Sequence, residues 1–185
     1  AKDDYQLESL SFPLIVASGT SKVIKITFDP LEVGTRAAAL VIDNEIVGNI
    51  SVPLLGVSIA PEIAISNIDS FGEAPLTTED PVKSATITNT GSSNLVISAI
   101  EKSGTDSSLF TVTSANLPIT IAPGESEAVS FTFNIPTSTT DVGNKNATVT
   151  FTSNDTTNPT IQKDISAEVI SLPNFSIASN ILELT

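Results

Sequence analysis

The sequence contains no cysteine, histidine, methionine or tryptophan among its 185 residues. The lack of cysteine excludes a disulfide framework and a thiolate metal site. The lack of histidine excludes a Ser-His-Asp triad and removes the most common general base and metal ligand. Because methionine is absent, we expect Ala1 to lie downstream of a start codon, in a processed protein or a fragment.

Aromatic residues and positive charges are also scarce. Aromatic residues make up 5% of the chain, and they comprise eight Phe and one Tyr, which disfavours sugar binding on flat aromatic platforms. The 21 acidic and 8 basic residues give a net charge of −13, so nucleic acid and anionic membrane surfaces would repel the chain. No apolar run is long enough to span a bilayer. An acidic surface fits an extracellular or salty setting.

The chain carries the same pattern twice. Residues 12–28, "FPLIVASGTSKVIKITF", align without a gap with residues 117–133, "LPITIAPGESEAVSFTF". Residues 32–42 resemble residues 141–151, and "PEIAIS" at 61–66 resembles "PNFSIA" at 173–178. The spacing between the copies changes only within turn-like segments, which is typical of tandem domains.

These alignments predict three domain segments. Residues 1–60 form the C-terminal half of one module, residues 61–172 form a complete module, and residues 173–185 form the first strand of a following module. A half module leaves sheet edges and apolar faces open. Either upstream sequence completes residues 1–60, or a neighbouring chain donates strands, with 173–185 as a candidate donor.

Apolar residues alternate with polar ones inside the complete module. In "EAVSFTF" Val129, Phe131 and Phe133 alternate with hydroxyl side chains, which is typical of a strand with one buried face. A tight turn at Gly124 precedes this strand, because glycine accepts a positive φ. The remaining strands are expected at 62–67, 82–89, 95–103, 109–113, 117–121, 147–152 and 160–170. Seven to eight short strands predict an all-β, antiparallel sandwich.

Several motifs together resemble the Hydin/ASH-type immunoglobulin-like module, known in bacterial surface proteins as the choice-of-anchor D repeat. The matching residues are Asn89, Gly91, Leu95, Ile97, Phe110, Ile121, Pro123, Gly124, Ser126, Phe133, Gly143 and Ser153-Asn154-Asp155. The last strand lacks the family's usual glycine at "AEV", whereas the earlier copy keeps one in "LLGV". The resemblance implies tandem immunoglobulin-like β-sandwiches that are mostly non-catalytic, extracellular parts of repetitive bacterial proteins.

Two loops carry oxygen ligands suited to calcium. Asn154, Asp155 and Asn158 lie in one loop, and Asp43, Asn44 and Glu45 lie in the corresponding loop of the other copy. Neither loop has EF-hand spacing. Each predicts either a calcium loop or an Asx-type turn joining two strands, and turn formation is the commoner role of these residues. Asp141 has the same two interpretations. Calcium is the one cofactor that the sequence suggests.

Glycosylation signals are also present. Asn49, Asn146, Asn154 and Asn174 each head an N-x-S/T sequon, and Thr156 follows Asp155 as in an Asp-Ser/Thr acceptor for O-glycans. Such matches arise easily by chance in a chain rich in threonine and asparagine.

No catalytic or cofactor-binding residue is expected. The carboxylates of Glu79, Asp80, Asp106, Glu125 and Glu127 lie in or beside turns, where acids are ordinarily solvated. The sequence therefore predicts a non-enzymatic stalk, spacer or filament segment of an extracellular bacterial surface protein or adhesin, with neighbouring copies of the module as partners. The alternatives are an accessory binding module of a secreted hydrolase and a strand-exchanged filament subunit or homo-oligomer.

Overall fold

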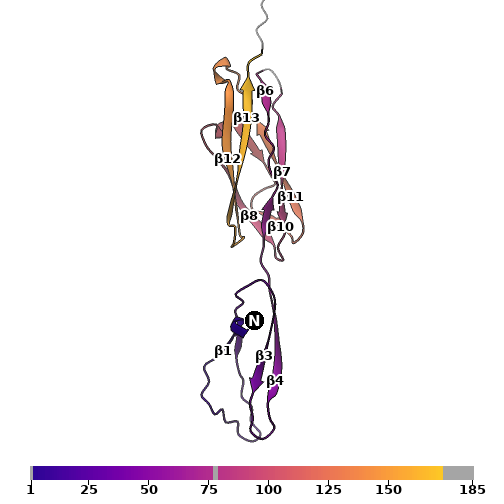
Figure 1. The fold of residues 1–185 in the computed structure, drawn as a ribbon, viewed down its shortest axis with the longest axis vertical. Helices are drawn as coiled ribbons and strands as arrows, with labels where there is room; N and C mark the ends of the chain where they lie inside the picture. Colours follow the sequence, from indigo (N-terminus) through magenta and orange to yellow (C-terminus); the bar gives the residue numbers. More distant parts are fainter. Residues whose placement is uncertain (1, 77–78, 173–185) are drawn as a thin grey trace, which may run out of the picture. The chain divides into compact units, whose positions relative to one another are not determined.

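The computed structural model describes residues 2–76 and 79–172, and the chain divides into two compact units between Ala60 and Pro61 (Figure 1). This division falls where the sequence repeat placed a module boundary. Strands dominate both units, so the predicted all-β class is confirmed. The helical elements of the described residues are three-residue 3₁₀ turns, and none has the length and apolar character needed to cross a membrane.

The second unit is a sandwich of two sheets. The larger sheet has the spatial order β10 (Ile119–Ile121), β8 (Leu95–Ser103), β12 (Gly143–Ser153), β13 (Thr160–Ile170) and β6 (Glu73–Pro75). The smaller sheet has the order β5 (Ile63–Ile65), β7 (Val82–Asn89), β11 (Ser126–Phe133) and β9 (Phe110–Thr113). Single 3₁₀ turns η2 (Ser107–Leu109) and η3 (Thr139–Asp141) precede β9 and β12. The immunoglobulin-like sandwich is thus present, with a ninth strand, β6, that the sequence did not predict.

All pairs in this sandwich are antiparallel except one. Strand β6 runs parallel to β13, with Glu73 opposite Glu168 and Pro75 opposite Ile170. Hydrogen bonds here join the N-terminal part of the unit to its last described strand. The backbone amide of Phe71 donates to Ser166 at 2.9 Å, and the amide of Glu168 donates to Gly72 at 2.9 Å.

The alternating pattern of β11 does build the core. The side chains of Val129, Phe131 and Phe133 are fully buried, as predicted. The ring of Phe133 lies 5.0 Å from that of Phe110 and 5.9 Å from that of Phe71. Burying each such side chain stabilises the unit by roughly 1.5–3 kcal/mol, so the interior is filled by side chains of both sheets.

The first unit consists of two separate strand pairs. The 3₁₀ turn η1 (Lys2–Asp4) leads into β1 (Tyr5–Leu7), which pairs with β2 (Ile26–Phe28), and β3 (Gly34–Ile42) pairs with β4 (Ile50–Ser58). Tyr5 is a strand residue, as expected from the sequence. Its ring lies 5.0 Å from that of Phe28, and its hydroxyl donates to the carbonyl of Arg36 at 2.8 Å. This hydroxyl contact links the two strand pairs.

Local geometry repeats between the units over more residues than the sequence alignment indicated. Tyr5 lies opposite Phe28 in the first unit, and Phe110 lies opposite Phe133 in the second, with ring separations of 5.0 Å in both. The aligned stretch therefore begins at Tyr5 rather than at residue 12. Gly19 and its counterpart Gly124 have φ values of 75° and 79°, which explains why both turns use glycine.

The strand pairing identifies the residue of β13 that corresponds to the glycine of β4. Gly56 lies opposite Arg36 in β4, and Ala167 lies opposite Lys145 in β13, so Ala167 is the counterpart of Gly56. A Cβ built on Gly56 would lie 2.5 Å from the ring of Phe28. The family glycine is therefore replaced by a small, buried alanine in the complete unit.

Candidate functional site

The loop proposed for calcium lies between β12 and β13. The Asp155 side chain is buried, and its two carboxylate oxygens are directed at backbone donors. One oxygen accepts from the amides of Thr157 and Asn158 at 2.8 and 3.0 Å, and the other accepts from the amide of Ile63 at 3.0 Å. The first pair forms the Asx-type turn that was the alternative to calcium. The third bond connects this loop to β5 in the opposite sheet.

These contacts shift the acidity of Asp155. Burial alone would raise the pKa of this carboxyl, but the amides of Ile63, Asn158 and Thr157 stabilise the charged form. The net effect is a pKa below its ordinary value, so the carboxylate is charged at neutral pH. Asp155 thus acts as an ionised connector between the two sheets.

Asn154 has a different partner. Its side-chain oxygen accepts from the amide of Val96 at 2.8 Å, and its side-chain nitrogen donates to the carbonyl of Asn94 at 3.2 Å. Its backbone amide also donates to Val96 at 3.1 Å. Asn154 and Asp155 are adjacent in sequence, but their side chains bind different strands. The Asn154 side chain binds β8, and the Asp155 side chain binds β5. The 79–172 and 2–76 ranges contain no group of three or more acidic residues arranged to hold a metal ion.

The corresponding loop of the first unit is also a turn. The side-chain oxygen of Asn44 accepts from the amides of Ile46 and Val47 at 2.9 and 3.1 Å. The amide of Gly48 donates to the carbonyl of Asn44 at 2.8 Å. Among its neighbours in this loop, Asp43 and Glu45 are exposed. The geometry is that of a turn closed by one asparagine.

The glycosylation candidates occupy different settings. Asn49 and Asn154 are exposed residues that flank strand ends, and Thr156 is exposed in the β12–β13 loop. Asn146 lies in β12, and Asn174 lies outside the described residues. The chemistry of these sites stays a prediction.

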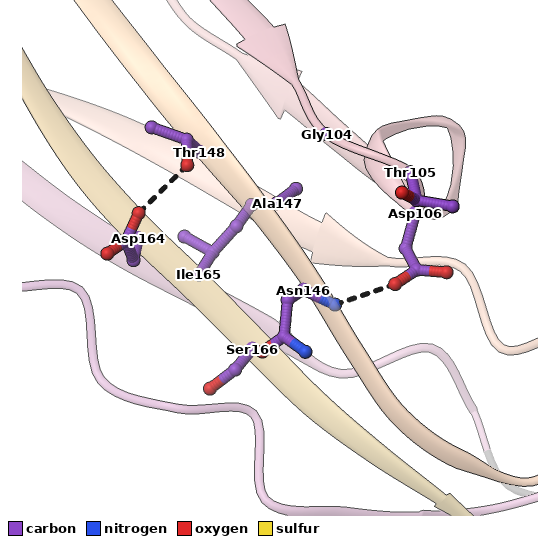
Figure 2. A pocket seen from close by; sticks show the side chains of 9 residues that line it. All are labelled: Gly104, Thr105, Asp106, Asn146, Ala147, Thr148, Asp164, Ile165 and Ser166. Carbon is purple, nitrogen blue, oxygen red and sulfur yellow. Dashed lines mark hydrogen bonds between the residues drawn. The ribbon is translucent and has the colours of Figure 1, made fainter.

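A hollow opens beside the sequon at Asn146. It has a volume of about 600 Å³, and Figure 2 shows it lined by the turn at Gly104–Asp106 and by β12 and β13. The Asp106 carboxylate accepts from the backbone amide of Asn146 at 2.9 Å. The Asp164 carboxylate accepts from the hydroxyl of Thr148 at 2.8 Å (Figure 2). Each acid thus has its own partner within the hollow, and the arrangement contains no aromatic platform for a sugar ring.

The other turn carboxylates are separated along the fold. Asp80 precedes β7 and accepts from the amide of Ile135 at 2.9 Å. Glu125 and Glu127 lie at the opposite end of the β7–β11 pair, where Ser126 faces Thr88. These turn carboxylates therefore do not converge on one site.

One residue that matched the family motif has a role that the sequence did not predict. Asn89 is fully buried, and its side-chain nitrogen donates to the carbonyls of Ser93 and Ile121 at 2.8 and 2.9 Å. Its side-chain oxygen accepts from the amide of Gly91 at 3.0 Å. Since Ile121 belongs to β10 in the other sheet, Asn89 joins the sheets at the end where β7 stops. Its position before a turn was visible in the sequence, but its partners were not.

The fold and these buried connectors correspond to a known family. Residues 62–168 match the model of the HYDIN/CFA65/VesB-like, Ig-like domain family, so the chain belongs to this family. The predicted resemblance to Hydin/ASH-type modules is thereby confirmed. No curated protein matches the chain.

Solved structures that are similar to parts of the chain come from bacteria and from humans. A Porphyromonas gingivalis W83 protein of unknown function is 14% identical, with a TM-score of 0.51 over 90% of this chain and 80% of its own. The VesB protease of Vibrio cholerae is 18% identical, with a TM-score of 0.45 over 57% of this chain and 31% of the protease. The ASH/PapD-like domain 7 of human CEP192 is 16% identical, with a TM-score of 0.43 over 62% of this chain and 89% of its own.

Proposed function

We propose that the chain is a non-catalytic, load-bearing segment of a long, repetitive, extracellular bacterial protein. It would serve as a stalk or spacer that holds a distal adhesive region away from the cell, or as part of a filament. The main support is the parallel pairing of β6 with β13. Strand β6 lies near the start of the second unit, and β13 is its last described strand.

This pairing suits a segment under tension. A pull on the two ends of the unit would draw β6 and β13 in opposite directions along their length. The hydrogen bonds between the strands lie across that direction, so several would carry the load together and not break one at a time. The side-chain connections made by Asn89 and Asp155 would hold the sheets together under the same load.

The chemistry of the second unit also supports a structural role. Its buried polar side chains, Asn89 and Asp155, bind backbone groups of their own domain. The large aromatic side chains of β9, β11 and β12 are buried in the core, where they cannot bind a ligand at the surface. The acidic composition fits an extracellular location.

Single-molecule force spectroscopy of the full chain tests the load-bearing role. The double variant Glu73→Cys and Glu168→Cys places the only two cysteines opposite each other on β6 and β13. Adjacent strands lie about 4.8 Å apart, which permits a disulfide. Oxidation should remove about 340 Å from the extension released on unfolding, at roughly 3.6 Å for each residue between the cysteines, and reduction should restore it.

A second pulling direction provides the matched control. Handles attached at Thr88→Cys and Ser126→Cys would open the antiparallel β7–β11 pair from one end, bond by bond. We expect a markedly higher rupture force when the unit is pulled from its two ends. Equal forces in both directions would contradict the proposal.

A second candidate function follows from the family itself. The family description includes VesB, and the VesB structure that this chain resembles is that of a protease. The chain could accordingly be an accessory module of a secreted hydrolase. The full-length gene distinguishes the two: further copies of the module support the stalk, and an adjoining catalytic domain supports the accessory role.

A further inference from the structure

The first unit exposes apolar side chains that the second unit buries. Most of the exposed large apolar side chains of the described residues lie between Leu7 and Ile59. Matched positions show the contrast directly. Val16 is 49% exposed, whereas its counterpart Ile121 is 4% exposed. Ile42 is 38% exposed, whereas its counterpart Phe151 is fully buried.

The strands of the first unit are shorter where a partner is lacking. In the second unit β11 extends over Ser126–Phe133 because β7 pairs with it along residues 126–132. Its counterpart β2 covers only Ile26–Phe28, the part that pairs with β1. Likewise, β10 pairs with β8 in the second unit, whereas the matching residues 14–16 form no strand. Among the described residues, the first unit lacks the pairs that counterparts of β6, β7 and β8 would make.

We propose that residues 2–59 form an acceptor for a polypeptide segment with the strand pattern of residues 61–103. A counterpart of β7 would pair with residues 21–27, and a counterpart of β8 would pair with residues 14–16 and with β3. The inward-facing side chains of that segment would cover Val16 and Ile42, as Leu95 and Ile97 are buried in the second unit. The occupant is therefore a four-strand half of the same family.

The short link between β8 and β9 in the second unit favours an occupant on the N-terminal side of the same polypeptide. In the second unit β8 ends at Ser103, and residues 104–106 lead directly into the 3₁₀ turn η2. The turn η1 occupies the matching place at Lys2–Asp4, with β1 following it as β9 follows η2. A preceding strand would reach the acceptor through the same short connection. In a second copy, by contrast, the segment 61–103 is already paired within its own sandwich.

Grafting tests this inference with the chain's own sequence. A copy of residues 61–105 placed before Ala1 reproduces the natural spacing, because Ala1 aligns with Asp106. We expect the amides of residues 14–16 and 21–27 to gain at least a hundredfold protection in hydrogen exchange, compared with the full ungrafted chain. A matched graft with Ile87→Asp and Ile97→Asp in the added copy should give no such protection.

Two results would overturn the proposal. One is unchanged exchange at residues 14–16 and 21–27 in a grafted chain whose second unit remains folded. The other is an ungrafted chain that forms oligomers by light scattering and already protects these amides, since pairing between copies would then fill the acceptor. This experiment measures residues 2–59 alone, so its failure is distinguishable from failure of the load-bearing role, which is measured in the second unit.

Discussion

Replacing Asp155 by alanine is expected to destabilise the second unit by about 2–5 kcal/mol. The change removes three hydrogen bonds to one charged acceptor. The amide of Ile63 would remain buried without a partner, which costs about 1–3 kcal/mol. The amides of Thr157 and Asn158 belong to exposed residues and can bind water instead, so each loss costs about 0.5–1 kcal/mol.

Urea denaturation followed by far-ultraviolet circular dichroism measures this change. The chain has no tryptophan, and its one tyrosine is Tyr5 in the first unit, so fluorescence does not report on the second unit. Asp155→Asn should fall between wild type and alanine, because it keeps one acceptor oxygen. Asp164→Asn is the matched control, since this exposed acid makes one bond to the hydroxyl of Thr148. It should cost less than about 0.5 kcal/mol.

The pH dependence of the same variants gives an independent check. The folded-state pKa of Asp155 is lowered, so its stabilisation is present above the unfolded pKa of about 3.9 and is lost as the pH falls through the folded value. The stability difference between wild type and Asp155→Asn should be constant from about pH 7 to pH 5 and should shrink below about pH 4. An alanine variant within about 0.5 kcal/mol of wild type at pH 7 would refute the assigned role.

Four further changes test other contacts. Asn89→Asp should lower stability by about 3 kcal/mol or more in urea titration, because a carboxylate oxygen would face the carbonyls of Ser93 and Ile121. Gly56→Ala should change the fluorescence of Tyr5, because the added Cβ displaces the Phe28 ring that packs on it; an unchanged spectrum would contradict that packing. Glu73→Gln should raise stability by about 0.5 kcal/mol at low salt, since Glu73 faces Glu168 across the parallel pair. Chelation of calcium should leave the melting temperature unchanged, because backbone amides already occupy the Asp155 oxygens; a drop on chelation would indicate a bound ion.

The core was predictable because it depends on a local pattern. The alternation in β11 fixes which side chains share a face, so the burial of Phe131 and Phe133 follows from sequence spacing alone. Strand β6 was missed because its three residues, Glu-Ala-Pro, contain too few positions to show alternation and include a proline. Its place is set by the distant strand β13, which local sequence does not reveal.

The candidate calcium loop was also predictable only in part. Asn and Asp after a strand predicted either a turn or a metal loop, and both readings used the same residues. The bond from Ile63 to Asp155 spans 92 residues, so no local pattern could indicate it. The same holds for Asn89, whose bond to Ile121 joins two sheets. Sequence reasoning identified these residues but could not identify their partners.

Comparison of β2 with β11 shows how partners determine the extent of a strand. Both segments carry the same alternation of apolar and polar residues at aligned positions. Only β11 forms eight residues of strand, because β7 and β9 supply hydrogen-bond partners on both sides. Segment 21–25 has the same pattern and lies outside β2; Lys25 exchanges hydrogen bonds with Glu8, but no described strand pairs with this segment. The alternation therefore encodes which face will be buried, whereas a second strand is required before the backbone adopts the ladder.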